Sequence, residues 1–253
     1  MHLIDSHCHL DDDRLDAVRD AVLRRAAGAE VTRIVVPATT ANRWEKVKQV
    51  CAAAPGLYPA YGLHPMFVAQ HQVIHLRELD EWLAREQAIA VGECGLDFYD
   101  SRIDEQWQKQ LFSEQLGLAE NHRLPVIVHA RKAMDEVISL LRKYSRRGGV
   151  VHSFAGSRQQ AMQLYDLGFK LGIAATVGFE RAQKLRSVVA AMPDDALLLE
   201  SDAPDQPGAA HRGELNEPAF IVEHLQTMAE LRDTSPETLA AQLNRNCEQL
   251  FNI

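Results

Sequence analysis

The sequence predicts an α/β fold made of a single (β/α)8 barrel of the TIM type, with the active site at the C-terminal ends of the strands. Short apolar segments alternate along the chain with segments of helical periodicity, which indicates a parallel sheet covered by helices. The length of 253 residues is typical of such a barrel, so we expect one domain over residues 1–253. An open doubly wound sheet would place a glycine-rich loop after its first strand, whereas Ser6-His7-Cys8-His9 stands there.

The expected strands are short and rich in Val, Ile and Leu, which is typical of parallel strands that are buried on both faces. The segment 33–37 is an example, because it is β-branched and apolar except for its first residue. We expect strands, in chain order, at 3–9, 33–37, 57–62, 89–93, 126–129, 150–152, 169–174 and 196–200.

The expected helices separate these strands and close the chain. In the first helix, Leu15, Val18 and Val22 recur at helical spacing, and Gly28 supplies a stop signal. The least regular segment, 203–217, is expected to be an active-site loop, and Asn216 is expected to cap the helix that follows it. We expect helices at 14–27, 44–53, 76–85, 103–122, 134–144, 158–167, 179–191, 218–231 and 236–251.

The composition, 46% hydrophobic and 25% charged residues, is that of an ordinary globular protein. No uninterrupted apolar stretch reaches the roughly 20 residues that cross a bilayer, and the N-terminal segment lacks the features of a signal peptide. The four cysteines form no C-x-x-C pair and are expected to be reduced. We therefore expect a cytoplasmic monomer that does not bind membranes.

The formal net charge of −8 argues against a broad electropositive surface that holds duplex nucleic acid. It does not exclude a phosphate substrate, because the charge at the site counts for more than the total.

The first expected strand carries His7 and His9, which alternation places on the same side as a ready pair of metal ligands. In a chain with eleven histidines such a pair also arises by chance, so it needs partners. Later strands supply them at their ends. They are Glu93, His129, His152 and Asp202.

Taken singly, each of these residues has another explanation, as a core histidine, a helix cap or a turn residue. Together they fall at the same structural point of successive repeats, and strand ends in a barrel converge on one mouth. Four imidazoles and two carboxylates exceed what one tetrahedral ion needs and suit two metal ions. Glu93 can bridge them. With Glu93 and Asp202 as the anionic ligands, two divalent ions leave a net charge of about +2, which favours phosphate oxygens.

The same residues lie in five motifs that follow one another between Asp5 and Pro204. They are Asp5-Ser6-His7-Cys8-His9-Leu10, Gly92-Glu93-Cys94-Gly95-Leu96-Asp97-Phe98-Tyr99, Val128-His129-Ala130-Arg131, His152-Ser153-Phe154-Ala155-Gly156 and Leu199-Glu200-Ser201-Asp202-Ala203-Pro204. This series resembles the TatD family of metal-dependent deoxyribonucleases, in the amidohydrolase-like superfamily, and within it the YjjV-type branch. Asp205-Gln206-Pro207 departs from the family's usual loop, which leaves the substrate range open.

The resemblance implies hydrolysis of phosphodiesters in DNA, commonly from a 3′ end, by two bound metal ions. It implies that one ion is held by His7, His9, Glu93 and Asp202, and the other by Glu93, His129 and His152. It also implies a substrate contact for His64, at the rim, and for Arg131. Both residues have a structural alternative, His64 as a cap of the third strand and Arg131 as the partner of a carboxylate.

We interpret the protein as a two-metal hydrolase of phosphodiesters, a DNase acting on single strands or 3′ ends of DNA. Asp202 and Glu93 are the candidate catalytic residues, Asp202 as general base of a water activated by the metals and Glu93 as the bridge. Two alternatives stay open: the same centre could hydrolyse an amide or ester, or the barrel could bind a partner without catalysis. Histidine with carboxylate suits Zn, Mn, Ni or Co, and Mg is a weaker candidate.

Overall fold

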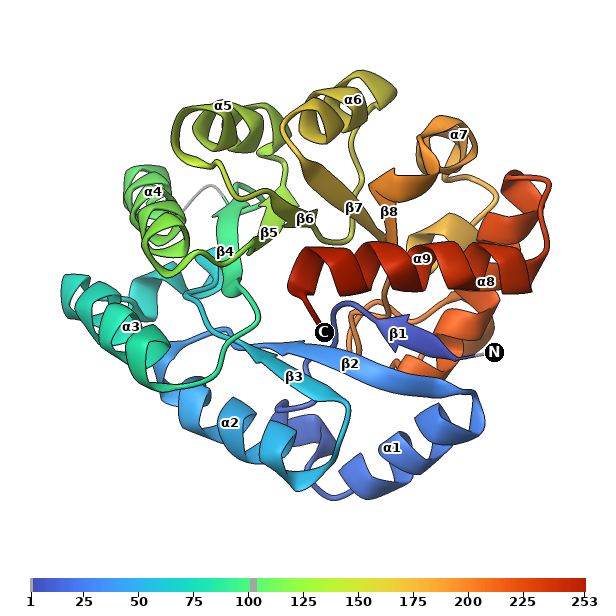
Figure 1. Ribbon diagram of the computed structural model, residues 1–253, viewed down its shortest axis with the longest axis horizontal. Helices are drawn as coiled ribbons and strands as arrows, with labels where there is room; N and C mark the ends of the chain where they lie inside the picture. Colours follow the sequence, from blue (N-terminus) through green and yellow to red (C-terminus); the bar gives the residue numbers. More distant parts are fainter. Residues whose placement is uncertain (1, 101–103) are drawn as a thin grey trace.

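The computed structural model describes residues 2–100 and 104–253 of the chain. Strands and helices alternate, and each strand pairs in parallel with its sequence neighbour (Figure 1). The strands within the described residues are β1 (Leu3–Asp5), β2 (Val31–Pro37), β3 (Leu57–Ala60), β4 (Val91–Asp97), β5 (Val126–Arg131), β6 (Gly149–Val151), β7 (Phe169–Ile173) and β8 (Leu197–Leu199).

Regular pairing forms two arcs, β1-β2-β3 and β4-β5-β6-β7-β8, and shorter contacts join them. Between β3 and β4, the Tyr61 carbonyl accepts a hydrogen bond from Gly92 N at 2.8 Å. Between β8 and β1, Ser6 N donates to the Leu199 carbonyl at 2.9 Å. Both seams are parallel, so the strands surround one interior.

The helices cover the outside of the strands (Figure 1). Side-chain caps start several of them: Ser157 accepts from Gln160 N, Ser235 from Thr238 N, and Asp104 from Trp107 N. Their bounds are α1 (Arg19–Gly28), α2 (Trp44–Ala53), α3 (Val73–Arg85), α4 (Glu105–His122), α5 (Met134–Tyr144), α6 (Arg158–Asp166), α7 (Gln183–Ala191), α8 (Ile221–Leu231) and α9 (Pro236–Phe251).

Several element ends differ from the sequence prediction. The first helix begins at Arg19, because Asp12 caps a separate 3-10 turn at residues 13–15. The helix expected at 179–191 begins at Gln183. The expected start of the helix at 103–122 lies outside the described residues. The first strand ends at Asp5, and the backbone beyond it bonds to both neighbours: Cys8 N donates to the Val35 carbonyl of β2 at 3.0 Å, and His9 N donates to the Ala203 carbonyl after β8 at 2.8 Å.

Helix α9 closes the barrel at the end where the strands begin (Figure 1). Its Asn246 side chain donates to the carbonyls of Asp194 and Leu197, ahead of β8 and at its first residue. Its Cys247 and Phe251 pack among interior side chains of the strands, including Ile4. The opposite end, where the strands finish, is therefore the open one. Among the described residues, no helix is both long enough and apolar enough to span a bilayer.

Candidate metal centre

Seven of the eight residues singled out in the sequence meet at the open end of the barrel. Each is carried by a strand or by the chain just beyond one, so the short strands determine where the side chains can reach. His129 lies in β5 and Glu93 lies in β4, which extends to Asp97 and does not end at the glutamate as expected. The others follow strand ends. They are His7, His9, His64, His152 and Asp202.

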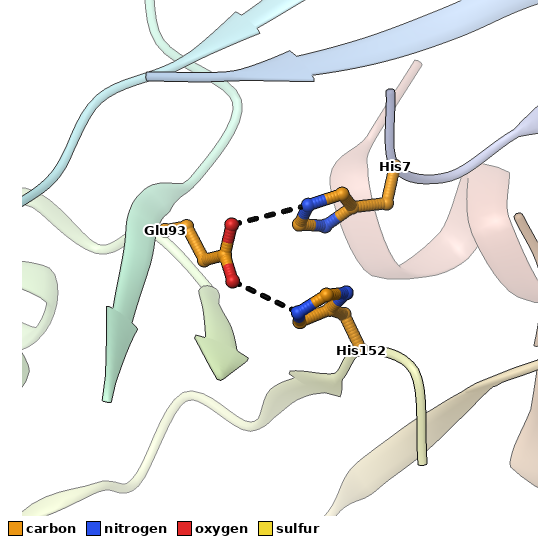
Figure 2. Close-up of side chains that lie close together, drawn as sticks. All are labelled: His7, Glu93 and His152. Carbon is orange, nitrogen blue, oxygen red and sulfur yellow. Dashed lines mark ion pairs between the residues drawn. The ribbon is translucent and has the colours of Figure 1, made fainter. Parts of the chain in front are cut away.

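The carboxylate of Glu93 stands between two groups of imidazoles. Its Oε2 lies 3.2 Å from His7 Nε2, while its Oε1 lies 2.8 Å from His152 Nε2 (Figure 2). The same Oε1 lies 3.0 Å from His129 Nδ1, and Oε2 lies 3.4 Å from His9 Nε2. The two oxygens of one fully buried carboxylate thus face different ligand sets.

The first set consists of His7, His9 and Asp202. The two Nε2 atoms are 3.2 Å apart, and Asp202 Oδ1 lies 3.6 Å from each of them. Cys8, between the histidines, points away and lies against the Ala203 carbonyl at 3.6 Å, as alternation predicts. The pair is therefore formed as expected, although the chain that carries it lies beyond the strand.

The second set contains His129, His152 and, in addition, His64. His129 Nδ1 lies 3.2 Å from His152 Nε2. His64 was expected at the rim, but it is buried, and its Nε2 lies 2.9 Å from Glu93 Oε1. The His152 ring also stacks on His7 with centroids 4.0 Å apart, so His152 borders both sets.

Hydrogen bonds hold the outer nitrogens of His9 and His129, whereas the carboxylate nearest to that of His152 lies beyond hydrogen-bond distance. His9 Nδ1 lies 3.1 Å from the Pro37 carbonyl, His129 Nε2 lies 3.1 Å from Asp97 Oδ2, and His152 Nδ1 lies 3.7 Å from Glu200 Oε1. Such partners fix ring orientation and raise ligand basicity. The sequence pattern alone predicted no role for Asp97 or Glu200. A signal for Asp97 existed, because it stands four residues after Glu93 in β4, on the same face.

Another buried carboxylate, that of Asp5, stabilises the chain segments that carry the first set. Asp5 Oδ2 accepts a hydrogen bond from Ser201 Oγ at 2.6 Å, and Asp5 Oδ1 accepts from the backbone of Ser201 at 2.9 Å and of His7 at 3.1 Å. Burial raises the pKa of Asp5 to about 7, against the lowering effect of its bonds with Ser201. Asp5 thus joins the end of β1 to the loop that carries Asp202.

The cluster shifts the protonation of its own members. Burial raises the pKa of Glu93, but the surrounding histidines, His152 foremost, lower it well below its ordinary value. Burial and then His152 lower the pKa of His7 well below its ordinary value. Burial also opposes charge on His9, yet Glu93 outweighs it and raises the His9 pKa to about 9. Glu93 thus favours charge on His9, whereas burial and His152 disfavour charge on His7.

The residues present fit a centre of divalent ions. Glu93 Oε2 is buried and has no hydrogen-bond partner among the described residues, although unsatisfied buried carboxylate oxygens are costly. In each of three groups of side chains, the ligand atoms lie within 4.8 Å of one another. Imidazole with carboxylate is the donor set of Zn, Mn, Co and Ni. The groups are His7 with Glu93 and His152, His7 with His9 and Asp202, and His64 with Glu93 and His129.

The chain matches the family model described as TatD related DNase over residues 4–252. It belongs to the TatD family. It is 39% identical over 253 residues to the Escherichia coli K12 protein named uncharacterized metal-dependent hydrolase YjjV, covering 99% of this chain and 98% of that protein. It is 31% identical over 253 residues to the Bacillus subtilis protein named uncharacterized metal-dependent hydrolase YabD, covering 99% of each.

The solved structures add the fold to this family assignment. The crystal structure of YjjV, a TatD homologue from Escherichia coli, matches with a TM-score of 0.95 and 38% identity, over 99% of this chain and 98% of that one. The predicted TatD resemblance and the predicted barrel fold are thereby confirmed.

In this TatD-family chain, a cavity of about 1340 Å³ opens over the centre. Its rim carries ion pairs. Arg14 bridges Asp12 and Asp205 at 2.8 Å each, and Arg43 holds both oxygens of Asp13 at 2.6 and 2.7 Å. These arginines are thus already paired with carboxylates.

The loop after β8 lies beside the cavity, as expected. Asn216 was expected to cap the following helix, but its side chain donates to the carbonyls of Ser201 at 2.7 Å and Asp205 at 2.8 Å. It therefore holds the loop against the end of β8. The amide of Gln206 from the same loop contacts Asp202.

Proposed function

We propose that the chain is a metal-dependent hydrolase that cleaves phosphodiester bonds, and that its substrate is DNA, cut in single strands or from 3′ ends. The main support is the placement of Glu93, whose two oxygens face two sets of ligands. A pair of metal ions at the two ends of one bridging carboxylate is an arrangement suited to in-line displacement at phosphorus. Family membership and the names of the relatives support metal-dependent hydrolysis.

The proposed centre comprises one set with His7, His9, Glu93 and Asp202, and another with Glu93, His129 and His152. Bound divalent ions would supply an acidified water and Lewis-acid stabilisation of the phosphoryl and leaving oxygens. Glu93 would hold the two sets together. Asp202, whose Oδ1 faces the first set, would take the proton of the attacking water and pass it outward. His64 adds a further imidazole beside Glu93, as a ligand or a contact to the phosphate.

The size of the cavity favours an extended substrate. At about 1340 Å³ it exceeds the range of about 300 to 1,000 Å³ that is usual for small-molecule pockets. Arg131 lines it with an exposed guanidinium, which fits the proposed contact with a phosphate. Monomeric state and cytoplasmic location stay predictions.

The test compares substrates on protein reconstituted with each candidate metal. We expect hydrolysis of labelled single-stranded oligonucleotides and of bis-p-nitrophenyl phosphate, and little hydrolysis of p-nitrophenyl acetate. Single- and double-stranded substrates labelled at either end give the polarity. A chelator should abolish turnover while circular dichroism stays that of the folded protein, because the barrel core is apolar and separate from the centre.

Glu93→Gln keeps the shape of the side chain and removes the charge, so it should lose activity. Glu81→Gln, on an exposed pair with Arg77 in α3, is the matched control and should retain it. Turnover of the acetate in preference to both phosphodiesters would reassign the centre to ester or amide hydrolysis.

A further inference from the structure

The cations around the cavity fall into two classes. Arg14 and Arg43 are held by carboxylates at ordinary ion-pair distances. Of the carboxylates that the structure describes, Arg131 reaches only Asp97, at 4.0 Å, and 47% of its side chain is exposed. Lys132 is exposed and has no ion pair with any carboxylate in residues 2–100 or 104–253. Free positive charge at the mouth is therefore concentrated at the end of β5.

An exposed aromatic ring lies against these two cations. Tyr99 is 57% exposed, the Arg131 Cζ lies 3.7 Å from its ring centroid, and the Lys132 Nζ lies 4.6 Å from it. The backbone N of Tyr99 donates to Asp97 Oδ1 at 2.9 Å, and the other oxygen of Asp97 holds His129. A single carboxylate thus links the ring to a candidate metal ligand.

The charge of the centre explains why cations outside it matter. Two divalent ions with Glu93 and Asp202 leave a net charge of about +2. Asp97 and Glu200, which lie beside the outer nitrogens of His129 and His152, would formally cancel that charge. An incoming polyanion then needs positive charge beside the centre as well as in it.

We propose that Tyr99, Arg131 and Lys132 form a nucleotide-binding platform beside the metal centre. The two cations would contact the phosphate next to the scissile bond, and the ring with the guanidinium plane would stack on the adjoining base. Stacking on aromatic side chains combined with cationic contacts to the backbone is how proteins bind single-stranded nucleic acid without reading its sequence. This inference rests on the proposed function, because it names the part of a DNA strand that the same site recognises.

Three variants test the platform. Tyr99→Leu removes the stacking ring, and Tyr99→Phe keeps it. Lys132→Gly removes the cation without loss of backbone fit, because Lys132 has a φ of 54°, a left-handed conformation that glycine adopts freely. Binding of a fluorescein-labelled oligothymidylate is measured by anisotropy on metal-free protein, where no cleavage occurs. The kcat and KM for the oligothymidylate and for bis-p-nitrophenyl phosphate are measured on the reconstituted protein.

We expect Tyr99→Leu to weaken oligothymidylate binding by about ten-fold or more, as loss of one stacked base does, and Tyr99→Phe to restore it. The loss in kcat/KM should be much larger for the oligothymidylate than for the small diester, because the diester has no second nucleotide. Lys132→Gly should weaken binding and reduce the slope of log K against log salt by about 0.7, the value for one phosphate contact on a single strand.

The chain offers a matched control on α5. Lys143 lies 4.7 Å from the ring centroid of Tyr144, so the pair repeats the contact between cation and ring, but Lys143, unlike Arg131 and Lys132, does not line the cavity. Tyr144→Leu and Lys143→Ala should leave oligothymidylate binding unchanged. A parent protein that binds and cleaves the oligothymidylate no better than Tyr99→Leu and Lys132→Gly would overturn the platform alone. A parent that neither binds nor cleaves it, yet hydrolyses other substrates, would overturn the proposed function and the platform with it.

Discussion

The side-chain amide of Gln206 donates a hydrogen bond to Oδ2 of Asp202. The other oxygen, Oδ1, therefore faces His7 and His9, at 3.6 Å from each Nε2. Gln206 is itself held, because its Oε1 accepts from Ser153 Oγ at 3.0 Å. One oxygen of the candidate base is thus occupied by the loop after β8, and the other is directed into the centre.

Gln206 should act as a positioning residue for Asp202. We expect Gln206→Leu to lower kcat by about ten-fold while KM changes less, because a misplaced base costs the transition state more than substrate binding. Gln206→Glu should lower it further, since a like charge beside Asp202 raises the Asp202 pKa. Steady-state kinetics with metal titrations on both variants check this. Equal kcat values for the parent and Gln206→Leu would contradict the role.

Asp202 is predicted to handle the proton as well as to hold a metal ion. Asp202→Asn keeps the shape of the side chain, so kcat should fall by about 10² or more even when metal is saturating, in line with general-base contributions. Single-turnover kinetics at rising metal concentrations separate the two roles. Recovery of the parent rate at high metal concentration would leave Asp202 as a ligand only.

Glu93 is predicted to be shared between both ions. Glu93→Gln should therefore weaken the binding of both ions, whereas His152→Ala should weaken mainly the binding of one. Isothermal titration with Zn²⁺ or Mn²⁺, checked by elemental analysis after gel filtration, gives the stoichiometry of each variant. His152 stacks on His7 of the other ligand set. If the ligands were shared between the two ions in another way, His152→Ala would lose both ions as well, and the prediction would be wrong.

His224 should make the fold sensitive to acid. It is buried in α8 with Nδ1 at 3.2 Å from the Glu200 carbonyl, and burial lowers its pKa from 6.5 to about 4. Between these values the unfolded chain binds a proton that the folded protein does not, so the free energy of unfolding falls as the pH falls through this window. From about pH 7 to about pH 5 the loss is on the order of 2 kcal/mol.

Urea unfolding of metal-free protein at the two pH values measures this loss. In His224→Gln it should be smaller by that amount. His211 is the counterpart, because its bond with Glu223 raises its pKa and its stabilisation is present at low pH. His211→Gln should therefore lose stability more steeply toward low pH than the parent. An unchanged pH dependence in His224→Gln would show that another group dominates.

The alternation of elements and the convergence of the ligands could be predicted from the sequence, because strand ends in a barrel share one location. His129 and Asp202 lie far apart in the chain, but each follows the same point of its repeat. The depth of His64 could not be predicted, since it depends on how the chain turns after β3. Nor could the pairing of Asp97 with His129 and of Glu200 with His152, because periodicity does not tell which carboxylate reaches the outer nitrogen of which imidazole.

The seam between β1 and β8 also sets the order in which the centre can be built. His7 and His9 are made early in synthesis, but Asp202 belongs to the loop after β8, and Ser201, beside that loop, donates two of the hydrogen bonds that Asp5 accepts. Until β8 and its loop have emerged, a nascent chain on the ribosome therefore lacks Asp202 and the bonds from Ser201 to Asp5. Ions that His7 and His9 bind before then lack the Asp202 carboxylate, so the first ligand set is complete only after β8 and its loop have been made.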